Sequence, residues 1–200
     1  TIENSGWAFL MNARVVNGKK FGWNSSLNLT IPRNKLVNFP DIDKSSYRNS
    51  YIIGKPVSIQ RKYSYIGVDP ATGLYIYADS HGNPTSSPIN NVDNTVVISQ
   101  FSKYFGGWQN SLSYKGLELD FLFQFVKQIA PSTRFGAFYT PGFFYSFNAS
   151  GNQPAIVMDR WQLPGDVAGV QKFTAADYDV ENSYYRVSSS DAYYRDASFL

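Results

Sequence analysis

Large apolar side chains occupy every second position in several stretches of this chain, which is the period of a β-strand whose two faces differ. From position 21 to position 31 the alternate residues are Phe21, Trp23, Ser25, Leu27, Leu29 and Ile31. The residues between them are Gly22, Asn24, Ser26, Asn28 and Thr30, all small or polar. The stretch therefore predicts a strand with one apolar and one polar face.

A similar stretch lies directly before it and predicts a partner strand. Its alternate residues are Trp7, Phe9, Met11, Ala13 and Val15. The sequence Asn17-Gly18-Lys19-Lys20 separates the two stretches, and Asn-Gly is a strong signal for the tight turn of a hairpin. Residues 6–31 are thus predicted to form a β-hairpin.

A second hairpin is predicted over residues 104–126. Before the turn at Lys115-Gly116, the apolar residues Trp108, Leu112 and Tyr114 alternate with polar ones. After the turn, the alternate residues are Leu117, Leu119, Phe121, Phe123 and Phe125. Each arm has about the 9–11 residues that a tilted strand needs to cross a bilayer.

The composition leaves two classes of protein open. Aromatic residues make up 17% of the chain and charged residues 16%, against about 25% charged residues in a typical soluble domain. Mean hydropathy is −0.30, and no run approaches the roughly 18 apolar residues of a transmembrane helix. A β-barrel in lipid fits this composition. A secreted or surface-attached, glycan-binding β-sandwich fits it too.

Two further observations favour the barrel. The predicted polar faces carry Asn, Ser, Thr and Gln with few charges, whereas the exposed faces of soluble sheets usually hold more Lys and Glu. Short turns at 17–20 and 115–116 alternate with long segments at 32–103 and 127–194. Outer-membrane barrels likewise pair short periplasmic turns with long extracellular loops. We therefore expect both long segments to be irregular loops on the cell surface.

Several classes of function lack support in the sequence. The chain has no cysteine, which excludes disulfides, thiolate metal sites and a cysteine nucleophile. The net charge is only +3 with scattered Lys and Arg, so no nucleic-acid surface is predicted. His81 is the single histidine and lies in a polar turn, which argues against a catalytic dyad or a zinc site. Asp177, Asp179 and Glu181 alternate as calcium ligands can, but we expect solvated loop acids, no cofactor and no enzyme activity.

Short motifs along the chain resemble, in the same order, the late part of the barrel of SusC/RagA-like TonB-dependent transporters. The clearest is YSYIGVDPATG at 63–73, which resembles the family's "YKYAGVDPATG". Further similar stretches are NSGWAF at 4–9, FGWNSSLN at 21–28, NKLV at 34–37, YIIGKPV at 51–57, YFGG at 104–107, LSYKGLEL at 112–119, DRWQLPGD at 159–166 and RDASFL at 195–200. Residues 127–155 match nothing in the family, and Ser5, Trp7 and 57–60 depart from its pattern. These departures bear on the substrate rather than on the family.

The resemblance implies an all-β fold. The chain is expected to be an antiparallel segment of a transmembrane β-barrel, with about four to six strands of a larger barrel of about 22. Its parts are then a hairpin at 6–31, an extracellular loop at 32–103, a hairpin at 104–126, an extracellular loop at 127–194 and the start of a further strand at 195–200. The first residue is Thr1 rather than Met, and with the closing motif this leads us to expect a piece of a longer protein.

The resemblance also implies a function and partners. Such transporters lie in the outer membrane and import glycans or peptides together with a SusD-like surface lipoprotein. A TonB complex energises them through an N-terminal part that these residues do not include. The expected partners of this chain are therefore the rest of its parent barrel, the plug domain inside that barrel, the lipoprotein and outer-membrane lipid.

The alternation and the loops supply three sets of candidate residues. Those expected to face the barrel lumen are Asn12, Arg14, Asn24, Asn28, Gln109, Glu118, Asp120 and Gln124. Those expected to face lipid are Trp7, Phe9, Trp23, Leu27, Tyr114, Phe121 and Phe123. The loop aromatics considered for ligand binding are Tyr63, Tyr65, Tyr75, Tyr77, Tyr139, Phe143 and Tyr145, with packing of the loops against one another as the alternative. Asp159, Arg160 and Trp161 are expected to tie a loop down through an ion pair and an anchoring ring.

Overall fold

A computed structural model of the chain describes residues 1–132, 135, 154–174 and 178–200. The described residues divide into two compact units. The first consists of Thr1–Ile59, Ser99–Ile129 and Asp196–Leu200. The second consists of Gln60–Ile98 and Ala130–Arg195. Both predicted hairpins fall within the first unit, and most of the two long segments forms the second.

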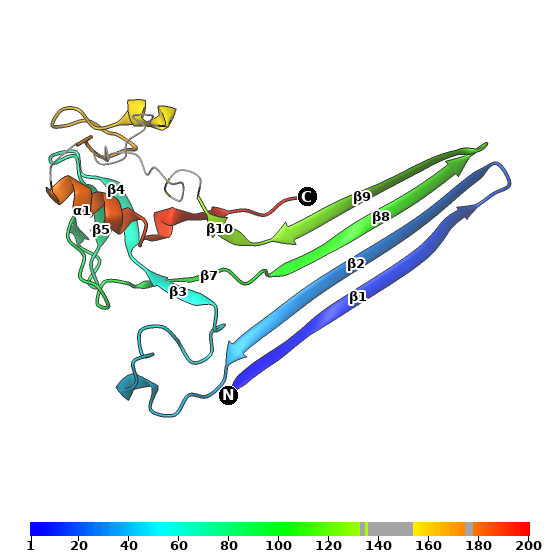
Figure 1. The fold of residues 1–200 in the computed structure, drawn as a ribbon, viewed down its shortest axis with the longest axis horizontal. Helices are drawn as coiled ribbons and strands as arrows, with labels where there is room; N and C mark the ends of the chain where they lie inside the picture. Colours follow the sequence, from blue (N-terminus) through cyan, green and yellow to red (C-terminus); the bar gives the residue numbers. More distant parts are fainter. Residues whose placement is uncertain (133–134, 136–153, 175–177) are drawn as a thin grey trace, which may run out of the picture. The chain divides into compact units, whose positions relative to one another are not determined.

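The first unit is built on a four-stranded antiparallel sheet with the order β1-β2-β8-β9. Its strands are β1 (Ile2–Asn17), β2 (Phe21–Leu36), β8 (Tyr104–Tyr114) and β9 (Leu117–Lys127). In Figure 1 the two hairpins lie side by side, with both tight turns at the same end. The first hairpin is longer at both ends than the predicted 6–31, because its pairing runs from Ile2 opposite Leu36 to Asn17 opposite Gly22.

The two tight turns close in different ways. Lys115 and Gly116 both have positive φ, 48° and 86°, as in the two-residue turns that match the twist of a hairpin. In the first hairpin the amide of Gly18 donates to the carbonyl of Phe21 over 2.9 Å, so the turn is centred on Lys19-Lys20 and not on Asn-Gly. A register shift between Arg14 and Val16 interrupts the pairing of β1 with β2 shortly before this turn.

Further segments extend the sheet at the end away from the turns. The amide of Gly54 donates to the carbonyl of Leu36, and the amide of Leu36 donates to that of Lys55, both over 2.8 Å. Phe199 forms an antiparallel bridge with Val126, the residue before the last of β9. Backbone polar groups at the end of β2 and near the end of β9 thereby gain strand-like partners.

The second unit contains short elements rather than the irregular loops that the sequence analysis expected. The strands outside the four-stranded sheet are β3 (Ile59–Lys62), β4 (Ser64–Val68), β5 (Tyr75–Ala78), β6 (Pro84–Thr85), β7 (Val96–Ser99), β10 (Ile129–Pro131) and β11 (Tyr194–Asp196). The helical elements of the whole described chain are η1 (Ile42–Lys44), η2 (Ala155–Asp159), α1 (Tyr178–Val187) and η3 (Asp191–Tyr193). Strands β4, β5 and β6 form a three-stranded sheet, β3 pairs with β7, and β10 pairs with β11. No helix in the described ranges is long and apolar enough to cross a membrane.

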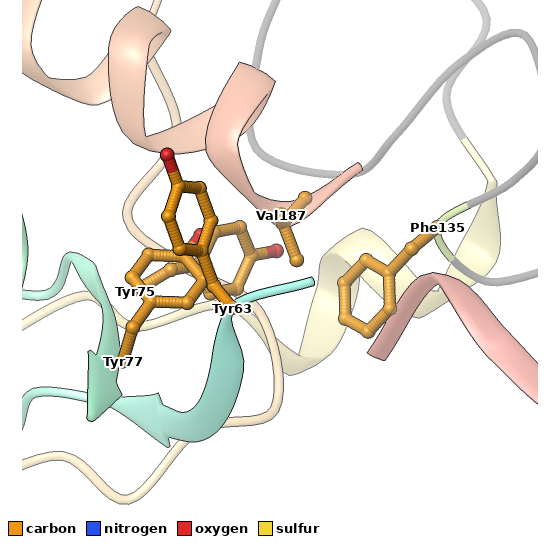
Figure 2. Packing of buried hydrophobic residues seen from close by; sticks show 5 residues of the cluster. All are labelled: Tyr63, Tyr75, Tyr77, Phe135 and Val187. Carbon is orange, nitrogen blue, oxygen red and sulfur yellow. The ribbon is translucent and has the colours of Figure 1, made fainter. Parts of the chain in front are cut away.

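An aromatic core holds the second unit together. Tyr63, Tyr75, Tyr77, Phe135 and Val187 form a buried cluster in which Tyr75 and Tyr77 are 0% exposed (Figure 2). The ring centroids of Tyr75 and Phe135 lie 5.8 Å apart in an edge-to-face arrangement, the geometry that aromatic pairs prefer. Because segments far apart in sequence converge on this cluster, the two long segments fold as one unit instead of separate loops.

The hydroxyl of Tyr77 is buried with its ring and needs a partner. It donates to the carbonyl of Ser183 over 3.3 Å. The hydroxyl of Ser183 in turn accepts the amide of Tyr75 over 3.2 Å, which ties β5 to α1. Burial raises the pKa of Tyr77 above its usual range, so this phenol stays neutral and remains a donor at any physiological pH.

A tryptophan fixes the turn that precedes β5. The indole of Trp161 donates to the carbonyl of Pro70 over 2.9 Å. A Cβ on Gly73, whose φ is +73°, would come within 2.5 Å of the Trp161 ring. The Thr72 hydroxyl and the Ala71 amide donate to Asp69 and hold the pKa of that carboxyl below its usual value. The anchoring ring was predicted, but the Asp159–Arg160 ion pair is not among those that the described residues form.

Replacing Gly73 by alanine is expected to open this turn. The substitution adds the roughly 1–2 kcal/mol strain of a positive φ to a clash with Trp161. Limited proteolysis of the parent protein in detergent micelles measures the effect, as faster cleavage within residues 60–98. The matched control is Gly82→Ala, since Gly82 also has a positive φ of 88° but nothing lies within 4 Å of its Cβ position. Equal cleavage of the two variants would show that Trp161 does not constrain the turn.

Candidate functional site: the two faces of the four-stranded sheet

The register of the sheet sorts its side chains into one apolar and one polar face. Leu27 lies opposite Met11 on one side and Trp108 on the other, and Trp108 lies opposite Phe123. Because paired residues point to the same face, the residues predicted to face lipid all share that face. We call it the apolar face. Its residues on the four strands are Trp7, Phe9, Met11, Ala13, Phe21, Trp23, Ser25, Leu27, Leu29, Ile31, Gly106, Trp108, Asn110, Leu112, Tyr114, Leu117, Leu119, Phe121, Phe123 and Phe125.

Nothing in the first unit covers the apolar face. Trp7 is 63% exposed, Phe9 54% and Leu119 58%, and the unit has no second sheet among its described residues. A soluble β-sandwich buries such a face under its other sheet. The rival prediction of a glycan-binding sandwich therefore lacks the layer that it requires.

The rings on the apolar face contact one another along and across the strands. The ring centroids of Trp7 and Phe9 are 6.2 Å apart and stacked, and those of Trp108 and Phe123 are 5.8 Å apart. At the turn end, Lys115 places its ammonium 5.2 Å from the centre of the Tyr114 ring. An aromatic side chain with a cation beside it is typical of the border between a bilayer and water.

Two polar residues interrupt the apolar face and pair with its indoles. Ser25 and Asn110 lie directly opposite each other on β2 and β8. The Trp108 indole donates to the Ser25 hydroxyl over 2.8 Å, and the Trp23 indole donates to the Asn110 side-chain oxygen over 3.0 Å. Both indole N–H groups are thereby satisfied without water, which is what a hydrocarbon environment demands.

The sequence analysis did not recognise Asn110 as part of this face. Asn110 is 0% exposed. The available signal was a break in the alternation, since Asn110 occupies the position between Trp108 and Leu112 where an apolar residue was due. A second break, at Ser25, falls directly opposite in the register. Two polar residues that fall out of pattern on neighbouring strands are a signal for a cross-strand pair.

The polar face holds every residue that was predicted to line the lumen. Asn24 lies opposite Arg14 and Ser111, and Ser111 lies opposite Asp120. The same alternation places the others on this face, namely Asn12, Asn28, Gln109, Glu118 and Gln124. The hydroxyl of Ser26 donates to Asn12 over 2.7 Å across the β1–β2 pair. The face is thus rich in amides and hydroxyls, with Arg14 at one side and two acids at the other, and it also carries the exposed apolar side chains of Leu10, Phe105 and Leu122.

Two shallow cavities lie along the strands. One has a volume of about 320 Å³ and is lined by Asn12, Arg14, Asn24, Ser26, Gln109 and Ser111 together with Ala13 and Ser25. The other, of about 330 Å³, includes Asn28 and Gln124 in its lining. The fold therefore gathers six of the eight predicted lumen residues around two hollows, and leaves Glu118 and Asp120 nearer the turn.

Four of the seven loop aromatics considered for ligand binding lie in the core of the second unit or pack against it. Tyr63, Tyr75 and Tyr77 lie in the core of the second unit, and Tyr65 packs against it half-buried, so none presents a free ring face to a sugar. They pack the loops together, which was the stated alternative. Tyr139, Phe143 and Tyr145 lie outside the described residues. Their proposed contact with ligand remains a prediction.

His81 and the acids considered for calcium binding were the remaining candidates for a catalytic or metal site. His81 is exposed in its turn, and its nearest ring-nitrogen contact is the Ser80 hydroxyl at 3.4 Å. The described residues contain no group of three or more His, Cys, Asp or Glu side chains that could hold a metal ion. Asp177, the first of the three acids considered for calcium, lies outside the described residues.

Comparison with known proteins finds relatives of one kind. No family model matches the chain. TonB-dependent receptor P26 of Formosa agariphila is 26% identical over 187 residues, covering 80% of this chain and 18% of the relative. TonB-dependent receptor P3 of the same organism is 26% identical over 149 residues, covering 62% of this chain and 15% of the relative. The chain thus spans less than a fifth of the length of the curated relatives it matches.

Two solved structures share the fold. The structure of the RagAB peptide transporter superposes with a TM-score of 0.66 and 18% identity, over 98% of this chain and 22% of the other. The structure of the RagAB peptide importer in its closed-closed state gives a TM-score of 0.67 and 17% identity, with the same coverage. The match includes both the four-stranded sheet and the second unit, because almost the whole chain is covered.

Proposed function

Because this chain is part of a TonB-dependent receptor of the outer membrane with the SusC/RagA-like fold, and is not an enzyme, we propose that its four-stranded sheet is one section of the barrel wall. The apolar face meets hydrocarbon and the polar face lines the lumen. The observation that carries this assignment is the apolar face itself. Large side chains such as Trp7, Phe9 and Leu119 are more than half exposed there. The Trp23 and Trp108 indoles find their hydrogen-bond acceptors on the same face, in Asn110 and Ser25. Water would leave such a face exposed at a high cost in free energy, whereas lipid covers it.

The four strands require further protein on both sides. An open sheet edge is not tolerated in hydrocarbon, since unpaired backbone groups there cost several kcal/mol each. Strand β1 has one neighbour in the described sheet, and β9 has only the short antiparallel stretch at Phe199 as a second one. The remaining strands of the parent barrel are the partners that complete this hydrogen bonding.

The polar face fits contact with a plug domain and with passing substrate. Its neutral amides and hydroxyls form hydrogen bonds with many partners, and its charged residues Arg14, Glu118 and Asp120 lie on the two outer strands. The parent protein then imports nutrients of the peptide or glycan class, and the RagAB structures, which are of a peptide transporter, make peptides the first class to test. A SusD-like lipoprotein on the cell surface and a TonB complex at the periplasmic side are the proposed partners.

Import by the parent protein tests this function. Cells that lack the parent gene are compared with cells that carry it on a plasmid, each with labelled oligopeptides and, separately, labelled oligosaccharides. Accumulation of one class is expected only when the gene is present, and deletion of TonB should abolish that accumulation equally. A surface lipoprotein should purify with the parent protein from detergent-solubilised outer membranes. Import that persists without the gene, or that is independent of TonB, would refute the proposal.

A further inference from the structure

A group of basic residues lies immediately beyond the apolar face, at the end away from the tight turns. On the β1–β2 pair the apolar residues end with Trp7 opposite Ile31. The next two pairs on the same face are Ser5 opposite Arg33 and Glu3 opposite Lys35. Residues i and i+2, which share a face, are about 7 Å apart along a strand. The change from apolar side chains to cations on this face therefore takes place over about 7 Å.

These residues line a cavity of about 600 Å³ in the first unit. Arg33, Lys35 and Lys103 contribute three cations to its lining and Glu3 contributes one acid, which leaves a lining charge of +2 from three minus one. Neutral hydrogen-bonding groups complete the lining, among them Ser5, Asn34, Ser99 and Ser102. Segment 54–56, which pairs with the end of β2, and segment 99–103 form the other walls.

The three cations have no protein counter-ion within the part of the chain that the structure describes. The ion pairs there are Lys44 with Asp41 and Lys127 with Asp196. The ammonium of Lys127, at the end of β9, is thus neutralised by Asp196. Arg33, Lys35 and Lys103 have no such partner and are exposed around the cavity. An unpaired guanidinium flanked by two ammonium groups and hydroxyl donors is the arrangement that binds phosphate, through a two-pronged contact from Arg and point charges from Lys.

We propose that this cavity binds the phosphate group of a lipid in the outer leaflet. The proposal rests on the assignment of the apolar face to hydrocarbon made above. Ile31, Arg33 and Lys35 alternate on that face and line the cavity, together with Pro32 and Asn34 of the other alternation. A phosphate held there therefore lies beside acyl chains that cover Trp7 and Ile31. A substrate anion would instead pass along the opposite, polar face. Glu3 weakens the site, because its carboxylate lies opposite Lys35 and repels a phosphate.

Binding of lipid A to the parent protein in detergent micelles tests the site. The phosphorylated lipid is titrated against wild type, against Arg33→Gln/Lys35→Gln/Lys103→Gln and against Lys19→Gln/Lys20→Gln/Lys115→Gln. The second triple variant removes the same number of cations at the opposite end of the strands. Each basic residue near an anionic lipid surface contributes about a fivefold factor, so removal of all three is expected to weaken binding about a hundredfold. The second variant should bind like wild type.

Further measurements distinguish a lipid phosphate from free phosphate and exclude misfolding of the variant as the cause of weaker binding. Dephosphorylated lipid A should bind wild type and the first variant equally weakly. Inorganic phosphate should not compete; if it binds as tightly as the lipid, the site is one for free phosphate and the proposal is overturned. Glu3→Gln should raise the affinity for phosphorylated lipid A a fewfold, a gain that a damaged fold would not produce.

Import measured on the same variants keeps this inference apart from the proposed function. Unchanged lipid affinity in Arg33→Gln/Lys35→Gln/Lys103→Gln overturns the lipid site, whatever that variant imports. Equal losses in both triple variants would also overturn it, because the effect would then be one of total charge. Failure of wild type to import peptides or glycans would instead count against the proposed function alone.

Discussion

Replacing Leu27 by lysine is expected to destabilise the parent barrel by about 2–4 kcal/mol if the position lies near the middle of the bilayer. Leu27 lies in the interior of the sheet, opposite Met11 and Trp108 on the apolar face. An ammonium at that position would lie among apolar side chains and acyl chains, far from water. The free energy of unfolding in urea, measured in lipid vesicles, gives the size of the effect.

The neighbouring substitution Asn28→Lys is the control. Asn28 lies on the polar face, opposite Leu10 and Gly107, and it is exposed. A lysine there stays in contact with the water of the lumen, so the change in stability should be within about 0.5 kcal/mol. Equal destabilisation by the two lysines would contradict the assignment of the faces.

Replacing Gly106 by alanine is the second change with a large expected effect. A Cβ on Gly106 would come within 2.1 Å of the backbone carbonyl oxygen of Asn28 and 2.7 Å of the Phe125 ring. The backbone of β2 cannot rotate away as a side chain can, so the two central strands must separate. Overpacking of this kind costs about 1–3 kcal/mol.

The adjacent glycine supplies the matched control for this prediction. A Cβ on Gly107 meets the end of the Leu122 side chain at 3.3 Å as its closest contact. That side chain is exposed and can move, so Gly107→Ala should leave the urea midpoint of the barrel nearly unchanged. If both variants unfold at the wild-type midpoint, β2 and β8 do not approach as closely as the structure shows.

The hairpins and their faces could be predicted because the information is local. Alternation with period two fixes which residues share a face, and Lys115-Gly116 fixes one turn without any knowledge of the rest of the chain. The first turn lies within the predicted residues 17–20, but the register shift after Arg14 was missed because no residue type signals it. The length of the strands beyond 6–31 was missed because Glu3, Arg33 and Lys35 interrupt the apolar pattern.

The second unit could not be predicted because its contacts join distant parts of the sequence. The amide of Tyr63 donates to the carbonyl of Ser189, and the amide of Tyr65 donates to Asp191, 126 residues away. No local pattern reports such pairs. Tyrosines at 63, 75 and 77 are compatible with an exposed sugar platform and with a core. Burial against α1 and Phe135 decides between these two roles, and only the fold reveals it.

Lipid accessibility of single side chains tests most directly the claim that hydrocarbon covers the apolar face. Cysteines are introduced into the parent protein one at a time, as Leu27→Cys, Asn28→Cys, Phe123→Cys and Gln124→Cys, and spin-labelled in lipid vesicles. This stretch of the protein has no cysteine of its own to interfere. Labels at 27 and 123 should be relaxed more by oxygen, which concentrates in the bilayer, and labels at 28 and 124 more by a water-soluble nickel chelate. The reverse order, or the same accessibility at all four positions, would contradict the account.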